Sequence, residues 1–342
     1  MDELLTMSVS TKPDNFASEG RKWVHRSLLA LASVAVVFVA VGLWAARSNL
    51  SGALEHIPWQ VIPEVIGLVS LGWLLRSLRW HYYVGQRKWP IPFTYSLLAF
   101  FSSFAFAVTP AKAGELVKSV LLRSRFDIPL ADGAGVLLVE RLGDLLAVMI
   151  LAAGGFTLMR DGLAYFVAAI LIVGGMTLVI SCRPASVALL ALFRRIHPKA
   201  APLAEKIARL LDSGRALLQP APLLTGIGIA LVSWTCEGLA FHLLVRCFGL
   251  AIQPVTSCAI FGIATVVGAM SALPGGLGSF EVVAVILLTR LGLPASTAIL
   301  PVLLFRFFSL WLTNLVGFFF LMHWLAFVSK NKTVSPLATV ML

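Results

Sequence analysis

Charged residues are scarce in this sequence. Only 13% of its 342 residues are Asp, Glu, Lys or Arg, whereas 59% are hydrophobic and the mean hydropathy is +0.92. In a soluble domain about a quarter of all residues are charged, so this composition excludes an ordinary soluble globular protein. Apolar stretches close to the length that crosses a bilayer recur along the whole chain. The composition therefore predicts an all-α polytopic membrane protein.

Several chemical motifs are also missing. The sequence contains no CxxC, HExxH, GxSxG or GxxxxGK[ST] motif, which argues against a redox or zinc site, a serine hydrolase and a nucleotide-driven pump. The 4 cysteines lie in or beside apolar segments, where we interpret them as packing residues rather than as a disulfide or metal pair. We therefore expect no cofactor and no metal. Any driving force would be an ion gradient, the membrane potential or the gradient of a lipid.

Lysine and arginine are unevenly distributed. They collect in 76–90 and 183–219, whereas 47–60 holds one arginine and 249–254 no charge. By the positive-inside rule, the basic segments are expected in the cytoplasm. The net charge of +11 then follows from topology, and no nucleic-acid partner is expected. The segment 183–219 is expected to be a cytoplasmic basic loop. It could also bind anionic head groups of the cytoplasmic leaflet, although orientation alone accounts for its charge.

The sequence divides into a membrane domain and two polar ends. Residues 1–26 are expected to form a cytoplasmic segment, 27–328 the membrane domain and 329–342 a cytoplasmic tail. We interpret 27–46 as a retained first helix; a cleaved signal peptide is the alternative, but its apolar region would be shorter. The expected location is a bacterial-type plasma (inner) membrane. About six full crossings are predicted, at 27–46, 61–76, 131–159, 163–182, 222–248 and 303–328.

Two apolar segments end differently from the others. Residues 91–109 run into "TPAKAGE" and 255–273 run into "LPGGLGSFE". Each is followed by an apolar return, 116–122 or 282–291, that is too short to cross a bilayer. Broken helices at membrane depth are tolerated where they are buried in protein or line a cavity. Both segments are therefore predicted to be re-entrant hairpins.

The two breaks share a spacing, P-x3-G-x(0–2)-E and then P-x11-R. It runs through Pro110, Gly114, Glu115, Pro129 and Arg141, and again through Pro274, Gly278, Glu281, Pro294 and Arg306. Three predicted crossings separate the hairpins, so the halves, about 91–159 and 255–328, form an inverted-topology repeat. Coincidental spacing is the alternative.

The residue types at the breaks suggest why the helices stop. Proline removes a backbone donor and glycine relaxes the dihedral angles, so the break residues are predicted to be Pro110, Gly114, Pro274, Gly275, Gly276 and Gly278. The helix that restarts presents free N–H groups, which can hold an anion. A carboxylate in its first turn, Glu115 or Glu281, could instead cap that end.

Charged side chains within apolar runs are costly and normally face a partner or a cavity. "VLLVERLGDLLAV" contains three of them, and Arg141 is spaced to pair with Asp144. They could be ion pairs that fix helix register, or they could line a path for a charged head group. The candidate substrate-binding residues are Lys112, Glu115, Glu140, Arg141, Asp144, Glu281 and Arg306. Glu237, outside the repeated pattern, is interpreted as structural.

The linked motifs "SLRWHYYV", "PAKAGELVKSVLL", "VERLGDLLAV" and "ALPGGLGSFE" resemble the lysylphosphatidylglycerol synthase transmembrane region, a flippase-like family. In that family the membrane region is implicated in moving aminoacylated phospholipid between leaflets, and a separate soluble domain attaches the amino acid. The resemblance places six charged residues on motif positions: Glu115, Glu140, Arg141, Asp144, Glu281 and Arg306. Since only a short tail follows 328, aminoacyl transfer is not implied.

Three functions remain open from the sequence. The first is translocation of a phosphate-bearing lipid, aminoacylated or polyprenyl-linked, or assistance to it. The second is an integral-membrane enzyme acting on a lipid or polyprenyl-linked substrate, for which paired carboxylates would serve as acid and base. The third is a lipid-binding scaffold for lipid-modifying enzymes. Membrane lipids are the expected partners in each case.

Overall fold

The computed structural model describes residues 59–109, 114–155, 180–196 and 201–330, with single positions between 167 and 177. The described part is helical and contains no strand, in agreement with the predicted all-α class. Its α-helices are α4 (Val61–Gln86), α5 (Phe93–Ser103), α6 (Val117–Phe126), α7 (Leu130–Ala153), α9 (Arg183–Ile196), α10 (Ala201–Gly214), α11 (Pro220–Cys247), α12 (Pro254–Met270), α13 (Ser279–Arg290), α14 (Ala295–Arg306) and α15 (Leu312–Lys330). The predicted crossing at 27–46 and most of that at 163–182 lie outside the described residues.

Three described helices are long and apolar enough to cross a membrane. They are Val61–Gln86, Pro220–Cys247 and the continuous Ala295–Ala326. The last includes a π-helical turn, η8 (Phe307–Trp311), between α14 and α15. Helix α7 has 24 residues but carries charges in its middle, and its crossing stays a prediction.

Helix α4 extends further than predicted. The crossing was predicted at 61–76, but α4 continues to Gln86 and contains Arg76 and Arg79. Trp73, Trp80 and Tyr83 are buried along the same helix, so its packed face continues past the two arginines. The helix therefore ends ten residues beyond the predicted crossing 61–76, and the cytoplasmic placement of 76–90 stays a prediction.

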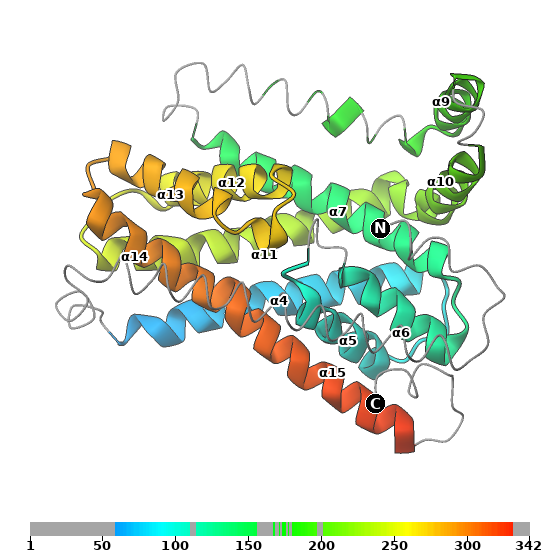
Figure 1. The fold of residues 1–342 in the computed structure, drawn as a ribbon, viewed down its shortest axis with the longest axis horizontal. Coiled ribbons are helices and arrows are strands. Elements are labelled where there is room, and N and C mark those ends of the chain that lie inside the picture. Colours follow the sequence, from blue (N-terminus) through cyan, green and yellow to red (C-terminus); the bar gives the residue numbers. More distant parts are fainter. Residues whose placement is uncertain are drawn as a thin grey trace.

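Helices α4 and α11 pack antiparallel at the centre of the molecule (Figure 1). The hydroxyl of Ser233 on α11 donates to Gly72 O on α4 at 2.9 Å. Towards the other end of α4, a Cβ added at Gly226 would meet the Tyr83 hydroxyl at 1.7 Å. Later residues of α4 therefore meet earlier residues of α11.

The hairpin helix of each half packs on the last helix of the other half. Tyr95 and Phe101 of α5 meet Trp324 and Phe320 of α15, at centroid distances of 5.8 and 4.9 Å. Helix α12 packs antiparallel on α7 in the same manner: a Cβ added at Gly262 of α12 would lie 2.8 Å from Ala152 N and 3.0 Å from Val148 O, while Gly154, beyond α7, faces Val255. This exchange makes the two halves structurally reciprocal.

Both predicted helix breaks are present. After α12, the chain passes through η7 (Pro274–Gly276) with positive φ at Gly275, Gly276 and Gly278, and α13 follows. After α5 comes η2 (Phe104–Phe106), and a Cβ added at Gly114 would lie 2.2 Å from Phe106 Cβ. Gly114 therefore lies directly against Phe106 before α6 begins. Pro110 lies outside the described residues, and the depth of both breaks in a membrane stays a prediction.

The basic segment 183–219 is folded rather than extended. It forms α9, α10 and the short helix η6 (Arg215–Leu218). Helix α10 is seated on the beginning of α7, because Ser213 donates to Ala131 O at 3.0 Å and Gly135 closely approaches Gly214 N.

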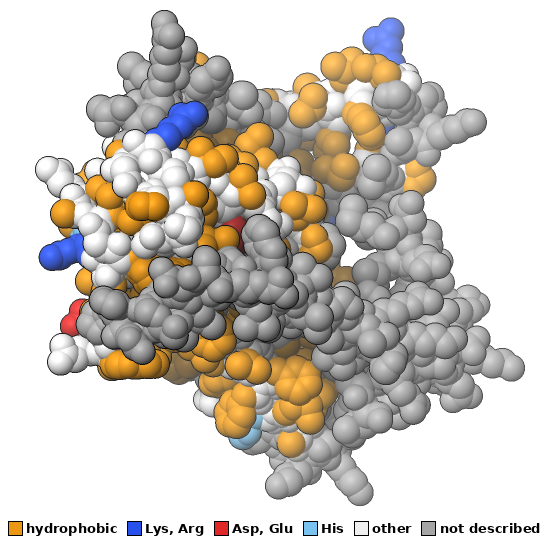
Figure 2. Space-filling view, turned by 60° about the vertical axis from the view of Figure 1, so that its left-hand side comes forward, with side chains coloured by type: hydrophobic (Ala, Val, Ile, Leu, Met, Phe, Trp, Pro, Cys, Tyr) orange, Lys and Arg blue, Asp and Glu red, His pale blue; other side chains and the backbone are white. Residues whose placement is uncertain are grey.

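The outer surface of the bundle is largely apolar. Figure 2 shows one face on which hydrophobic side chains dominate the described surface and charged ones are few. Exposed apolar residues recur on the long helices, among them Leu71, Leu74, Leu78, Leu224, Val232, Phe318 and Phe319. A surface of this kind suits lipid as its solvent.

We expect Gly317→Val to destabilise the protein by about 1–3 kcal/mol or more, the usual cost of overpacking a core without space for the added atoms. A Cβ at position 317 would lie 2.1 Å from Ala105 N and 2.3 Å from Phe104 C. These are backbone atoms, which cannot move without displacing the helix. Melting temperature in detergent measures the loss. The control is Gly228→Val, where nothing lies within 4 Å; equal melting temperatures for both variants would contradict the packing.

Candidate functional site: two ion-pair sites at the helix breaks

The first site begins with Arg141 on α7. Its Nη2 lies 2.9 Å from Glu115 Oε2 and 2.9 Å from Asp144 Oδ2. The predicted pairing of Arg141 with Asp144 is therefore confirmed. Because Glu115 follows the first break immediately, Arg141 also ties that break to the middle of α7.

A fully buried group of charges lies beside this contact. Lys118 on α6 forms an ion pair with Glu140 on α7. Its ammonium also lies 4.3 Å from the centre of the Trp80 ring and 5.3 Å from that of Phe100. Arg79 on α4 approaches Asp144 Oδ1 at 2.8 Å and Glu140 Oε1 at 3.9 Å. The network thus joins α4, α6 and α7.

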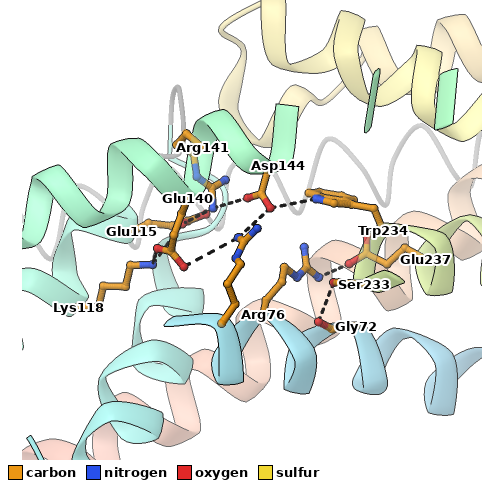
Figure 3. Close-up of polar contacts among 11 residues, drawn as sticks. Gly72, Arg76, Glu115, Lys118, Glu140, Arg141, Asp144, Ser233, Trp234 and Glu237 are labelled. Atoms are coloured by element: carbon orange, nitrogen blue, oxygen red, sulfur yellow. Dashed lines mark hydrogen bonds and ion pairs between the residues drawn. The ribbon is translucent and has the colours of Figure 1, made fainter. Parts of the chain in front are cut away.

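Helix α11 completes the network. Trp234 Nε1 donates to Asp144 Oδ1 at 3.1 Å. Arg76 of α4 forms an ion pair with Glu237, and its guanidinium lies 4.8 Å from the centre of the Trp234 ring. Figure 3 shows these side chains converging from α4, α7 and α11. Glu237, interpreted as structural from the sequence, joins two of the long helices.

The described network is electrically balanced. Four basic residues, Arg76, Arg79, Lys118 and Arg141, meet four acidic residues, Glu115, Glu140, Asp144 and Glu237. Each unpaired charge in an apolar interior would cost several kcal/mol, so pairing lets these residues occupy the bundle. The contacts join sequence segments up to 161 residues apart.

The second site repeats the acid–arginine contact of the first. Arg306 Nε donates to Glu281 Oε1 at 2.7 Å, and Arg306 Nη2 donates to Gly275 O at 2.5 Å. Glu281 Oε2 accepts from Gly278 N at 2.7 Å, so it caps α13 as one sequence hypothesis proposed. The guanidinium also lies 4.9 Å from the centre of the Phe280 ring. Arg306 therefore connects the second helix break to the end of α14 through hydrogen bonds to Glu281 and Gly275.

The two breaks come close to each other. A Cβ added at Gly275 would lie 3.3 Å from Leu310 Cδ2 and 3.6 Å from Val108 Cα. Leu310 belongs to the π-helical turn and Val108 follows η2. The break of the second half thus lies against the end of the first hairpin helix and against the irregular turn that follows Arg306.

The charges differ in their exposure, and this separates their possible roles. The Arg141 side chain is 32% exposed, whereas those of Arg79 and Glu140 are 1% exposed. Arg141 is therefore the most accessible of the charged residues in the described network. Arg79, Lys118 and Glu140 are placed to hold the helices and to orient their more accessible neighbours.

The structure describes six of the seven candidate substrate-binding residues, and their role in binding stays a prediction. Glu115, Glu140, Arg141 and Asp144 form one network, while Glu281 and Arg306 form a separate pair. Lys112 lies outside the described residues. Among the residues described, no group of three or more His, Cys, Asp or Glu side chains could hold a metal ion.

Sequence reasoning missed Arg76 and Arg79 as members of the site. The signal was available in the spacing of Trp73, Trp80 and Tyr83, which continues a buried helical face through the basic positions.

Comparison with known proteins identifies the family. The sequence profile described as "Lysylphosphatidylglycerol synthase TM region" matches residues 30–317. The chain belongs to this family. Among curated proteins, it is similar to a UPF0104 membrane protein of Methanothermobacter thermautotrophicus, with 26% identity over 304 residues that cover 83% of this chain and 90% of the relative. A further UPF0104 membrane protein of that organism matches with 27% identity over 95 residues, 28% of each chain.

The lysylphosphatidylglycerol synthase transmembrane-region family match includes both sites. Residues 30–317 contain the buried network, both breaks and the Glu281–Arg306 pair. The resemblance seen in the sequence motifs is thereby confirmed, and the chain is an all-helical membrane protein of this family.

Proposed function

We propose that this protein moves a phosphate-bearing lipid between the two leaflets of a membrane, or assists that movement. One observation carries the proposal: the repeat-equivalent pairs Glu115–Arg141 and Glu281–Arg306 each connect a helix break to the following long helix. Two ordinary register pairs would not need to recur at matching positions in both halves. The family match, whose name refers to a lipid synthase, points to the same class of substrate.

The reciprocal packing supports an inverted-topology repeat. Helices α5 and α12 each contact the last helix of the other half, and the corresponding helices α4 and α11 run antiparallel. Transporters with this symmetry bind substrate near the bilayer midplane, where discontinuous helices meet. We infer that both breaks are re-entrant and that they meet there, as the closeness of Gly275 and Val108 suggests.

The proposed binding groups are Arg141 and Arg306. Arginine presents a planar set of donors that suits a phosphate group. Each guanidinium is paired with a carboxylate. Phosphate binding would displace this carboxylate, which would then be available for an amine on the same head group. The acyl chains would remain in the surrounding lipid, which the apolar outer surface favours.

The distribution of charge supports a cytoplasmic location for one end of the bundle. The end of α4, the beginning of α7 and helices α9 and α10 lie together in Figure 1, and Arg87 approaches Asp132 at 3.6 Å there. Most of the basic residues of 183–219 belong to this end. The positive-inside rule then orients the N-terminal end of α7 towards the cytoplasm of a bacterial-type plasma membrane.

Leaflet sidedness in proteoliposomes tests the function. The protein is reconstituted with lipids that carry a fluorescent acyl chain and an anionic, zwitterionic or aminoacylated head group, and a membrane-impermeant quencher reports the exposed fraction. We expect equilibration between leaflets that depends on the head group and exceeds that of protein-free vesicles. The control variant is Arg290→Gln, which removes an exposed positive charge at the end of α13 and should leave the rate unchanged.

The opposite result is equally clear. If folded protein leaves every lipid in its original leaflet, the translocation proposal fails. A new lipid product in the same vesicles would favour an enzyme, and lipid binding without movement or product would favour a scaffold.

A further inference from the structure

Helix α9 has an apolar face that the described protein leaves uncovered. Leu189, Leu192 and Ile196 are 57%, 52% and 61% exposed. Their spacing of three and then four residues puts them on one side of the helix. The helix has 14 residues, too few to cross a bilayer, so this exposed stripe does not belong to a membrane span.

A face of α9 beside the stripe is fixed to the protein, since Ser186 lies about 60° around the helix from Leu189 and about 120° from Leu192. Ser186 is buried, and Arg215 Nη2 of η6 donates to its hydroxyl at 3.3 Å. Arg215 is itself held by Asp212 of α10 at 3.0 Å. These contacts fix the rotation of α9 about its own axis, and at this rotation the described protein leaves the stripe exposed.

Helix α10 provides the contrast. Its exposed side chains include Glu205, Arg209 and Asp212, which share one face and are charged. An exposed face of this composition is expected in water. The two neighbouring helices thus present different outer surfaces, and only that of α9 has the composition of a surface in contact with lipid.

Charge completes the argument for a lipid surface. Arg183 lies at the beginning of α9, and Arg194 and Arg195 at its end, all exposed. A short helix with an apolar face and basic residues lies in the plane of the membrane interface and is attracted by anionic lipids. In Figure 1, α9 and α10 lie at the end of the bundle and run across the direction of α11, as an interfacial helix requires.

We propose that α9 is an interfacial helix that inserts Leu189, Leu192 and Ile196 into the leaflet next to it and binds anionic phospholipid head groups through its arginines. Because α10 is seated on α7 at Gly135, close before Glu140 and Arg141, this contact also sets the height of the first ion-pair site relative to the membrane surface. The proposal does not depend on lipid translocation.

Labelling of the full-length protein tests the inference. In a background with all four cysteines replaced by alanine, single cysteines are introduced by Leu192→Cys on the stripe and Arg209→Cys on the charged face of α10, and both are labelled with an environment-sensitive fluorophore. The protein is reconstituted into vesicles of phosphatidylcholine, with or without phosphatidylglycerol. We expect blue-shifted emission at position 192, quenched by spin-labelled lipid, and emission typical of water at position 209.

Anionic lipid should strengthen the effect. Phosphatidylglycerol is expected to increase quenching by spin-labelled lipid at position 192, and added salt or the double variant Arg194→Gln, Arg195→Gln should remove this increase. Emission at 192 that resembles 209 in both vesicles would overturn the proposal. So would a label at 192 that neither lipid nor aqueous quenchers reach, since another part of the chain or a second copy would then cover the stripe.

Discussion

Glu140→Gln is expected to lower the free energy of unfolding by about 3–5 kcal/mol, the usual cost of removing one partner of a buried ion pair. In this variant Lys118 loses its closest ion-pair partner. Its ammonium remains fully buried beside the Trp80 and Phe100 rings. The amide has nearly the size of the carboxylate, so the loss comes from charge and not from packing. Thermal melting of the purified protein in detergent measures it.

A second substitution separates charge from shape. Lys118→Met, combined with Glu140→Gln, removes both charges while retaining a side chain of similar length. We expect the double variant to be more stable than Glu140→Gln alone, because no unpaired ammonium then remains in the interior. A double variant less stable than either single one would show that the pair is not the source of the effect.

An exposed ion pair provides the matched control. Asp212 on α10 forms an ion pair with Arg215 of η6, and its side chain is 58% exposed. The variant Asp212→Asn removes this pair. Exposed pairs contribute about 0–1 kcal/mol, so this variant should melt close to the wild type. If Glu140→Gln melts at the same temperature as Asp212→Asn, the network is not the framework that the structure indicates.

The sequence aligned the residues of the two repeat-equivalent pairs, although it did not predict their contacts, because the alignment depends on local spacing. Each glutamate follows a break, and each arginine lies twelve residues past a proline, so spacing alone aligned Glu115 with Glu281 and Arg141 with Arg306. The contacts then follow from helices that return beside the break, and the structure contains both of them. The capping role of Glu281 was likewise visible from its position in the first turn of α13.

The central part of the network was not predictable in the same way. Arg76 and Arg79 follow an apolar run and have no acid nearby in the sequence, which is also the pattern of a cytoplasmic loop. Their partners Glu237 and Asp144 lie on helices that only the tertiary fold brings to α4. The helical state of 183–219 was missed for a related reason, since a count of basic residues says nothing about the amphipathic pattern of α9 and α10.

The exposure of the charges gives them different parts in the proposed transport. Arg79, Lys118 and Glu140 are inaccessible, so their substitution should act first on stability. Arg141 and Glu115 are more exposed and lie at the first break, and Arg306 and Glu281 hold the second. Variants at these two pairs should therefore separate loss of transport from loss of fold.

Glu281→Gln is expected to slow head-group-dependent lipid movement by at least about tenfold, since a charge-assisted hydrogen bond contributes roughly 1.5–3 kcal/mol and each 1.4 kcal/mol corresponds to a factor of ten. The amide oxygen can still accept from Gly278 N, which Glu281 caps at 2.7 Å. The beginning of α13 should therefore persist. The melting temperature should fall because the buried Arg306 loses its ion-pair partner, but by less than in Glu140→Gln, since Arg306 still donates to Gly275 O. Glu281→Ala removes the cap as well and should lower stability by about 1 kcal/mol more.

Substitution of Arg306, the partner of Glu281, should also slow lipid transport. Arg306→Gln is expected to reduce transport at least as strongly, because it removes the proposed phosphate-binding group together with the contact to Gly275 O. Arg290→Gln, on the neighbouring helix end, is the matched control for loss of one positive charge. Transport by Arg306→Gln equal to that of Arg290→Gln would leave the pair with a structural role only.

The inverted repeat extends the prediction for Glu281→Gln to the equivalent residue of the first half, Glu115. If both breaks bind the same head group as the two halves alternate, Glu115→Gln in the first half should slow transport by a factor similar to that of Glu281→Gln. Glu115 contacts Arg141 at 2.9 Å, as Glu281 contacts Arg306 at 2.7 Å. A strong effect in one half with none in the other would show that a single break handles the lipid, and the reciprocal packing of the halves would then serve stability alone.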